Sequence, residues 1–274
     1  MKSPLKIAVL DLYAGTENQG MRCIREIIEK FSAKVHVATF DVFECRLSKS
    51  FPDLDYDVYF STGGPGSPLG DDTNNWEQDY FNWLDSILKF NLNKPSEERK
   101  HVFFICHSFQ LACRYFGVAT VNKRKSTSFG VFPVHLNNDG EKETVFQGLS
   151  NPFYAVDNRE YQAVQPDNER LNILGAKVLA IEKERQHVPL ERAIMSIRFN
   201  NEMIGTQFHP EADKEGMLTY LHGSEKKNMV IQNYGEEKWK SMIDQLNDPD
   251  KIEKTNATLL FQFLYSYIKA KSAS

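Results

Sequence analysis

The sequence has little cysteine, no long apolar run and no large excess of charge of either sign. Its 274 residues include four cysteines, with 33 basic and 37 acidic side chains and a formal net charge of -4. Four cysteines without C-x-x-C spacing exclude a disulfide scaffold, and neither a zinc ribbon nor a redox pair is expected. The near balance of charge offers no basic surface to a polyanion, so no nucleic-acid partner is expected.

The apolar runs are also too short for a membrane span or the core of a signal peptide. The first, at residues 7–10, stops at Asp11. A later stretch at 257–268 contains Gln262 and Tyr265 and is far shorter than the ~20 residues of a span. It reads as the buried face of a C-terminal helix. We therefore expect no membrane partner and a reduced, cytoplasmic location.

The order of the predicted elements is typical of an α/β protein. Strand patterns at 6–10, 35–40, 56–60 and 101–105 alternate with helical patterns at 17–31, 75–90 and 108–116. This alternation predicts a parallel sheet. From 129 to 208 the pattern changes, and short β-like runs follow one another at 131–136, 153–156, 177–181, 193–199 and 203–208. That second part predicts a mixed region of antiparallel strands.

The remainder of the chain is predicted to be helical. From residue 213 onward helical patterns dominate, with a break at 247–250. No internal repeat, low-complexity tract or obvious linker divides the chain into two units. We therefore expect one domain over residues 1–224 and a helical C-terminal extension over 225–274 that packs on the same domain.

The segment F-F-I-C-H-S-F-Q at 103–110 places a cysteine where a buried strand runs directly into a helix. Cys106 at this junction resembles a nucleophile elbow, which exposes the side chain and directs the N–H groups and dipole of the new helix toward it. Such surroundings favour the nucleophilic thiolate. The alternative interpretation is a plain buried cysteine, which is common at strand ends.

The segment G-T-Q-F-H-P-E at 205–211 places His209 and Glu211 two residues apart, on either side of Pro210. Proline biases the residue before it toward an extended conformation, in which positions i and i+2 lie on the same side. The imidazole and the carboxylate can then face one site, with Glu211 setting the histidine tautomer. A structural histidine beside a solvated glutamate is the alternative.

The segment G-G-P-G-S-P at 63–68 follows the strand predicted at 56–60. Glycines allow close approach of the backbone, so their N–H groups can line an anion site. The segment is no phosphate loop, because no G-K-[ST] follows and Pro65 removes a donor. A tight surface loop is the alternative.

Taken together, these three segments resemble the class I glutamine amidotransferases, and the resemblance extends from about residue 7 to 213. It implies an α/β fold built on an open, mostly parallel twisted sheet with helices on both faces. Three residues match the catalytic triad of that family, namely Cys106, His209 and Glu211. The main-chain N–H groups of Gly64 and His107 match its oxyanion hole, and Gln110 lies where a substrate-binding glutamine is expected.

The resemblance implies hydrolysis of the side-chain amide of glutamine through a cysteine thioester, giving glutamate and ammonia, with no metal and no organic cofactor. Cys106 would attack the amide, His209 would protonate the ammonia, and Glu211 would orient the imidazole. The chain is similar to the glutaminase domain of guanylate-synthetase-type enzymes. Because the about 60 residues after Asp213 contain no glycine-rich phosphate loop, the partner that uses the ammonia would be a separate synthase subunit.

The sequence departs from the family pattern at the elbow, where Phe104 and Ser108 stand in place of glycine. Small residues there let strand and helix approach closely, so Phe104 must find room in a neighbouring element. Ser108 is small enough to be tolerated. These departures bear on whether Cys106 keeps the geometry of an elbow.

A second departure lies in V-D-N-R-E-Y-Q-A-V at 156–164, where many relatives carry Ser-His or His-His. Arg159 and Glu160 occupy the matching positions. They are predicted to frame the carboxylate and the ammonium of a free amino acid. A surface charge pair without a role is the alternative.

Two other functions stay open at this point. The first is a γ-glutamyl hydrolase that acts on a γ-glutamyl amine or peptide without transferring ammonia. The second is a non-catalytic regulatory relative that binds an amino acid, against which the intact set of Cys106, His209 and Glu211 argues. The expected small-molecule partner is therefore glutamine or another γ-glutamyl compound.

Overall fold

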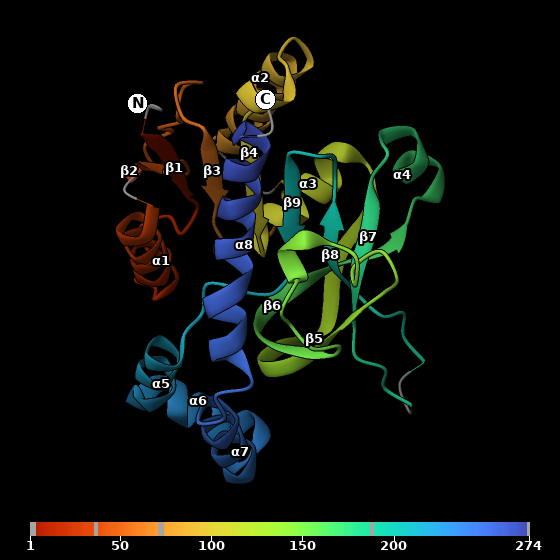
Figure 1. Ribbon diagram of the computed structural model, residues 1–274. Helices are drawn as coiled ribbons and strands as arrows, with labels where there is room; N and C mark the ends of the chain where they lie inside the picture. The colour runs from red at the N-terminus through yellow and green to blue at the C-terminus, as the bar shows by residue number, and fades with distance from the viewer. Residues whose placement is uncertain (1–3, 36–37, 71–73, 187–188, 273–274) are drawn as a thin grey trace.

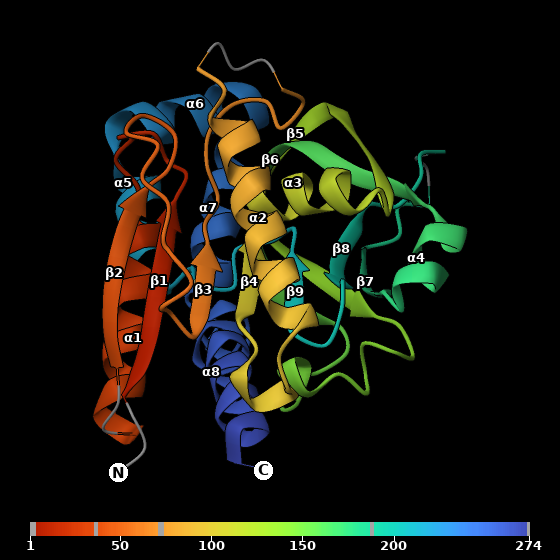
Figure 2. The ribbon, with the colours of Figure 1, turned by 90° about the horizontal axis from the view of Figure 1, so that it is seen from above.

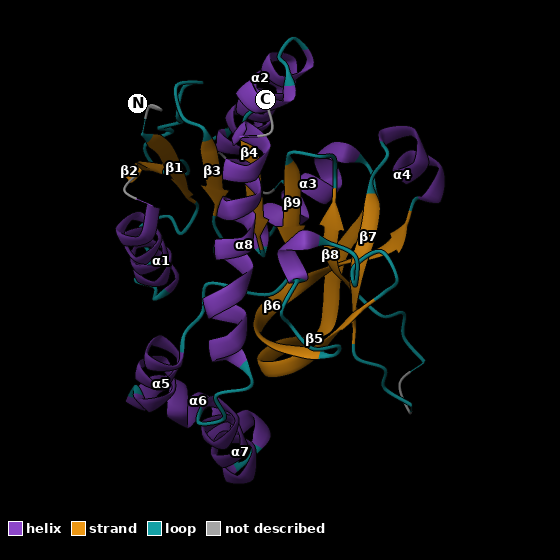
Figure 3. Ribbon diagram, in the orientation of Figure 1, coloured by secondary structure: helices purple, strands orange, loops and turns teal. Residues whose placement is uncertain are grey.

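The structure is a computed structural model that describes residues 4–35, 38–70, 74–186 and 189–272 (Figure 1). Its strands are β1 (Leu5–Asp11), β2 (Ala38–Glu44), β3 (Val58–Ser61), β4 (His101–Ile105), β5 (Ala119–Leu136), β6 (Phe153–Pro166), β7 (Lys177–Glu182), β8 (Ile194–Arg198) and β9 (Met203–Thr206). Its helices are α1 (Gly20–Val35), α2 (Trp76–Leu92), α3 (His107–Phe116), α4 (Asn168–Leu174), α5 (Lys214–His222), α6 (Ser224–Tyr234), α7 (Glu236–Leu246) and α8 (Ile252–Ser272). These described strands form one nine-stranded sheet in the order β2-β1-β3-β4-β9-β8-β6-β5-β7 (Figure 3).

The first half of this sheet is parallel, as the alternation of strand and helix patterns predicts. β1 pairs in parallel with β2 and β3, and β4 pairs in parallel with β3 and β9. All residues of β3 and β4 are buried. Strands covered on both faces need apolar side chains on both sides, which explains why these segments are continuous apolar runs.

Helices cover both faces of the parallel half (Figure 2). On one face lie α1 and α8, and their side chains Ile28 and Phe263 share a core with Val9 of β1. On the other face lie α2 and α3, where Trp83 and Phe109 belong to a second core. The chain therefore has the mixed α/β architecture that the sequence predicts, with the sheet as its middle layer.

The carboxyl ends of β1, β3, β4 and β9 meet at one edge of the sheet, because these strands run in parallel. The glycine loop at 63–68 follows β3, Cys106 follows β4, and the His209 loop follows β9. Three segments that are far apart in the sequence are thereby brought to the same edge.

The second half of the sheet corrects the expectation of an open, mostly parallel sheet. β8 pairs antiparallel with β9, and β5 and β6 pair antiparallel with each other. β7 pairs antiparallel with both β5 and β8, so that β8, β6, β5 and β7 close on themselves. The antiparallel region predicted between 129 and 208 is confirmed, whereas the parallel arrangement is limited to the first half.

β5 and β6 are longer than the sequence patterns predict. β5 begins at Ala119 instead of 131, and β6 continues to Pro166 instead of ending at 156. The added parts pair with each other, for example Lys123 with Tyr161, and most of the added residues of β5 are not buried. In the added part of β6 the buried residues include the charged Asp157 and Arg159, so this ribbon carries no clear apolar alternation and the periodicity of the sequence does not reveal it.

The helices after β9 fall into two groups (Figures 1 and 3). α5, α6 and α7 gather at one end of the molecule, where Leu221 and Val230 join Val131 of β5 in a third core. α8 begins after the predicted break and returns along the sheet, with Leu260 and Phe263 in the main core. Of the helices described, none has the length and apolar character that crossing a membrane requires.

Candidate active site

Cys106 occupies a tight turn between β4 and α3, as the elbow pattern predicts. Its backbone has φ 50° and ψ -96°, a conformation that residues with a side chain rarely adopt. The turn is held on both sides: the Cys106 N–H donates to the carbonyl of Thr206 at 2.8 Å, and its own carbonyl accepts from the Gln110 N–H at 3.1 Å. The thiol is thereby fixed at the N-terminus of α3.

His209 and Glu211 form a hydrogen-bonded pair in the loop after β9. The distance between His209 Nδ1 and Glu211 Oε1 is 2.8 Å, and the carboxylate is buried. The main-chain N–H of His209 donates to the carbonyl of Val156 in β6 at 2.9 Å. This bond anchors the histidine to the sheet.

Two neighbouring groups, Glu211 and Cys106, act on the pKa of the His209 imidazole. Burial lowers the pKa of His209, but the charges of Glu211 and Cys106 and hydrogen bonds to both outweigh burial and raise it well above its usual value of 6.5. The imidazole is therefore protonated near neutral pH. A proton held beside a thiol suits both a stabilised thiolate and a general acid.

The glycine loop after β3 packs tightly against the same residues. A Cβ atom on Gly63 would lie 2.9 Å from His209 Cε1 and 3.6 Å from Cys106 Cβ. A Cβ atom on Gly64 would overlap the main-chain oxygen of Leu12. Both positions therefore require glycine, and at Gly63 the main chain of this loop lies close to Cys106 and His209.

His107 contributes its main chain and not its ring to this edge of the sheet. As the first residue of α3, it has an N–H that the helix itself does not use. Its imidazole is buried against Trp76, and burial together with the charges of Arg46 and Arg114 lowers its pKa to about 3. The ring is therefore neutral, and the predicted oxyanion contact of His107 falls to the N–H.

Ser108, which replaces a glycine of the family pattern, connects two strands to the elbow. Its Oγ accepts a hydrogen bond from the Ile105 N–H at 2.8 Å and donates one to the carbonyl of Ser61 at 2.6 Å. The residue is fully buried. The hydroxyl thus joins the strand before the glycine loop to the strand before Cys106. The serine is therefore not only small enough for this position but also holds the two strands together.

Phe104, the other residue that departs from the family pattern, is accommodated next to the neighbouring strand β9. Its buried ring packs edge-on against Phe199, with 5.7 Å between the ring centroids. Gly205 in the neighbouring β9 makes the space, because a Cβ atom there would lie 3.0 Å from Phe104 Cβ and 2.8 Å from Phe109 Cδ2. The larger side chain is thereby accommodated, and Cys106 keeps the conformation of an elbow.

Two hydrogen-bonded glutamine side chains lead from α3 to the thiol. Gln110 Nε2 donates to the carbonyl of Tyr161 and to Gln207 Oε1, each at 3.0 Å. Gln207 Nε2 in turn lies 3.7 Å from Cys106 Sγ. Because Gln110 Nε2 donates its hydrogen bonds within the protein, the predicted contact of Gln110 with substrate would be made through Oε1. Gln207 was not predicted, although its place two residues before His209 in an extended segment was a usable signal.

Arg159 and Glu160 are not brought together, which corrects the prediction that they frame one amino acid. They are neighbours in β6 and so point to opposite faces of it. The Arg159 side chain is buried, with Nε 2.9 Å from each carboxylate oxygen of Asp157 and Nη2 3.5 Å from Glu182 Oε1. Glu160 is exposed and lies 4.0 Å from Lys123.

Arg159→Ala should therefore lower stability instead of weakening substrate binding. It removes the cation from the buried carboxylates of Asp157 and Glu182, and breaking a buried pair on one side costs about 3–5 kcal/mol. Denaturant titration should show this loss in the free energy of unfolding. Lys123→Ala, which removes the exposed contact with Glu160, is the control and should cost less than about 1 kcal/mol. If Arg159→Ala instead left the stability unchanged and strongly raised KM, Arg159 would have to be assigned to substrate binding after all.

Tyr13, in the loop after β1, is a second site residue that the sequence did not reveal. A Cβ atom on Gly20 would overlap the Tyr13 hydroxyl and lie 3.2 Å from Glu211 Oε1, so phenol and carboxylate border the same glycine. Burial, followed by the charges of Glu211 and Cys106, raises the pKa of Tyr13, which keeps the phenol neutral. A single aromatic residue after a strand has no chemical signature of its own.

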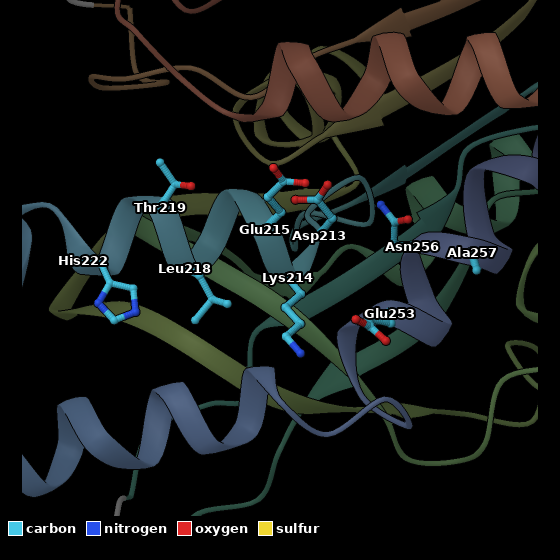
Figure 4. Close-up of a pocket in the computed structure, with 9 residues that line it drawn as sticks. All are labelled: Asp213, Lys214, Glu215, Leu218, Thr219, His222, Glu253, Asn256 and Ala257. Atoms are coloured by element: carbon cyan, nitrogen blue, oxygen red, sulfur yellow. The ribbon is translucent and has the colours of Figure 1, made fainter.

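A cavity of about 750 Å³ lies between α5 and α8 (Figure 4). Asp213 and Leu218 line it from α5 and its N-cap, and Glu253 and Asn256 line it from α8. None of the predicted site residues faces this cavity. Neither here nor elsewhere in the described ranges do three or more His, Cys, Asp or Glu side chains form a group that could hold a metal ion.

Comparison with known proteins agrees with this arrangement. The family description "Glutamine amidotransferase class-I" matches residues 8–221, which is more than half of the chain. The matched range includes the glycine loop, the elbow and the His209 loop. No curated protein matches the sequence.

Solved structures share the fold over almost the whole chain. A glutamine amidotransferase from Thermotoga maritima has a TM-score of 0.69 at 14% identity, covering 97% of this chain and 98% of that chain. A putative GMP synthase subunit from Thermoplasma acidophilum has a TM-score of 0.54 at 16% identity, covering 100% and 96%. The glutaminase domain of Trypanosoma brucei CTPS, solved with bound acivicin, has a TM-score of 0.57 at 13% identity, covering 97% and 94%. At such identities the likeness concerns the fold.

Proposed function

The chain belongs to the class-I glutamine amidotransferase family, and on that premise we propose that it hydrolyses the side-chain amide of glutamine through a cysteine thioester. The observation that carries the proposal is the 2.8 Å hydrogen bond between His209 and Glu211, beside a cysteine at the N-terminus of α3. An imidazolium and a helix N-terminus both stabilise a thiolate. The nucleophile is therefore available near neutral pH.

In the first half-reaction, the Cys106 thiolate adds to the amide carbon, and the carbonyl electrons move to the oxygen. The N–H groups of Gly64 and His107 bind this oxyanion, with a contribution of roughly 3–4 kcal/mol for each donor. The carbon–nitrogen bond then breaks as His209 gives its proton to the leaving nitrogen. Ammonia departs and the γ-glutamyl thioester remains.

In the second half-reaction, His209 is neutral and takes a proton from water as the water attacks the thioester. Glutamate leaves, and the thiolate and the imidazolium are restored. Glu211 holds the ring by Nδ1 and stabilises its positive charge without accepting the proton. Gln110 is proposed to contact the substrate through Oε1.

The ammonia is proposed to serve a separate synthase subunit in the cytoplasm. The likeness to a putative GMP synthase subunit supports a partner of this type. Residues 214–274 contain no glycine-rich phosphate loop, so these residues are not proposed to supply an ATP site of that kind. All four cysteines are free and buried, which agrees with a reducing compartment.

An electrophilic glutamine analogue such as acivicin should label Cys106 and no other thiol. Burial raises the pKa of Cys23 to about 12, and it also raises the pKa values of Cys45 and Cys113, so these thiols stay protonated at neutral pH. Mass spectrometry of the digested protein should find one equivalent of label on Cys106. Cys106→Ser should abolish labelling, whereas Cys113→Ser should not change it. Label found only on another cysteine would reject the assignment of the nucleophile.

Substrate profiling then separates this reaction from a γ-glutamyl hydrolase. Glutamine should release ammonia at a rate that exceeds the release of amine from γ-glutamyl amines or γ-glutamyl peptides. A clear preference for a γ-glutamyl amine would keep Cys106, His209 and Glu211 in their roles and change the substrate. Binding of glutamine without turnover would favour a regulatory relative.

A further inference from the structure

Helix α8 contacts two strands that lead into the proposed active site and the loop that carries Glu211. The ring of Phe263 packs against Phe60 of β3 and Phe103 of β4, at 5.9 and 5.1 Å between centroids. These two strands lead into the glycine loop and the elbow. Near the start of the helix, Asn256 Nδ2 donates to the main-chain oxygen of Glu211 at 2.7 Å. Yet α8 lies outside residues 8–221, the range that matches the family.

The carboxylate of Glu211 depends on its main chain for its position. Oε1 is bonded to His209, but Oε2 is buried and has no hydrogen-bond partner among the described residues. His209 is therefore the single partner of the carboxylate within that part of the chain. Where the carboxylate lies relative to the imidazole is then decided by the placement of the Glu211 peptide.

Four contacts place this loop. The N–H of His209 donates to the carbonyl of Val156 in β6 at 2.9 Å, the N–H of Ala212 donates to the carbonyl of His209 at 3.3 Å, and the Asp213 carboxylate is bonded to Arg22 at 2.6 Å. The fourth contact, from Asn256, is the one that reaches the carbonyl of Glu211 itself. Without it, the turn closed by Ala212 remains, but the Glu211 peptide loses the bond that fixes its tilt, and the carboxylate moves with it.

We propose that Asn256 is a positioning residue of the active site: by holding the carbonyl of Glu211, it keeps the Glu211 carboxylate against Nδ1 of His209. Helix α8 thereby becomes part of the catalytic apparatus. This inference rests on the proposed amide hydrolysis, since it names a further residue on which the same triad depends.

The cavity between α5 and α8 makes a substitution at Asn256 structurally mild. Asn256 and Ala257 border the cavity from α8, opposite Lys214 and Leu218 of α5 (Figure 4). Water can replace the lost amide there without leaving a defect in the packed core. Alanine is also the best helix former, so Asn256→Ala should leave α8 folded.

Thr255, the preceding residue, offers a matched control. Its Oγ1 donates to the main-chain oxygen of Tyr154 in β6 at 2.6 Å. It therefore makes the same kind of bond as Asn256, from the same turn of α8, to a carbonyl that does not belong to the triad. Thr255→Val removes this bond with little change in shape. Thermal unfolding should show a similar, small loss of stability in both variants.

The kinetic experiment compares the two variants with the parent protein. We expect Asn256→Ala to lower kcat for glutamine about tenfold with KM nearly unchanged, because the misplaced carboxylate affects chemistry more than binding. Thr255→Val should keep kcat within about twofold of the parent. Asn256→Ser, whose hydroxyl is too short to replace the amide, serves as the second variant if the alanine variant does not fold.

The pH dependence of kcat/KM provides a second measurement, which a mere loss of stability would not change. The groups that face His209 are Glu211 of its own loop, Cys106 of the elbow and Tyr13 of the loop after β1. When Glu211 moves away, the pKa of His209 falls toward its usual value, and the imidazolium is lost at lower pH. The basic limb of kcat/KM should therefore move to lower pH by about one unit in Asn256→Ala.

Equal kinetics and equal pH profiles for Asn256→Ala and Thr255→Val would overturn the inference. Alkylation of Cys106 by iodoacetamide separates this result from a failure of the proposed function, because the reaction needs no substrate. Even if the parent did not hydrolyse glutamine, Asn256→Ala should react severalfold more slowly than Thr255→Val near neutral pH, since less imidazolium leaves less thiolate. Equal alkylation rates would overturn the positioning role by itself.

Discussion

Replacing His209 with alanine should suppress glutamine hydrolysis almost as fully as replacing Cys106, with a fall in kcat of roughly 10⁴-fold or more. In the proposed mechanism the imidazole performs two proton transfers, to the departing ammonia and from the attacking water. Glu211→Ala should be milder by roughly one to two orders of magnitude, because the imidazole remains and loses only its orientation and the charge that raises its pKa. Steady-state release of ammonia from the purified variants measures both effects.

His135→Ala provides the control for this comparison, since His135 lies on β5 away from the triad loop. It should keep kcat within about twofold of the parent. Parental activity in Glu211→Ala would reduce the triad to a dyad of Cys106 and His209. Parental activity in His209→Ala would remove the imidazole from both proton transfers.

Gly64→Ala should lower kcat by roughly 10²–10³-fold in a protein that remains folded. A Cβ atom at this position overlaps the main-chain oxygen of Leu12, so the loop after β3 has to move away from β1. That movement takes the Gly64 N–H out of reach of the oxyanion. Because the charge on this oxygen develops only in the transition state, kcat should fall while KM changes little.

Gly223→Ala is the matched control for the added methyl group. Gly223 has φ -56°, which any residue adopts, and the nearest atom to a Cβ there is the main-chain oxygen of Tyr220 at 3.4 Å. Circular dichroism should show both variants folded, and Gly223→Ala should keep the parental kcat. A Gly64→Ala protein that also keeps the parental kcat would show that this loop supplies no oxyanion donor.

The parallel half of the sheet and the residues that gather at its edge could be predicted because each has a local signature. β4 is a continuous apolar run followed at once by Cys106 and a helix. His209 and Glu211 share one short segment in which Pro210 favours an extended backbone. Each of these patterns alone also fits a plain buried cysteine or a structural histidine, so the prediction that the three residues form one site rests on the resemblance to the class I glutamine amidotransferases.

Contacts between distant segments could not be predicted, because nothing local records the partner. Ser108 was expected only to fit, yet its hydroxyl joins Ser61 and Ile105 across two strands. The sequence predicts Arg159 at the substrate, but the pairing of β6 with β5 and β8 turns it inward, where it meets Glu182 of β7. Strand register is a property of the whole sheet, and a shift by one residue would have placed Arg159 on the other face.

The position of α8 in the chain decides when the active site can form. Ribosomes extend a chain from its N-terminus, so Cys106, His209 and Glu211 are all synthesised before α8 begins at Ile252. Until α8 docks, the side of β3 and β4 that receives Phe263 is bare to water, and the carbonyl of Glu211 has no amide to bind. On the proposed function, a nascent chain that stops before α8 would carry Cys106, His209 and Glu211 without either of these contacts, and we expect it to release ammonia more slowly than the chain with α8 in place.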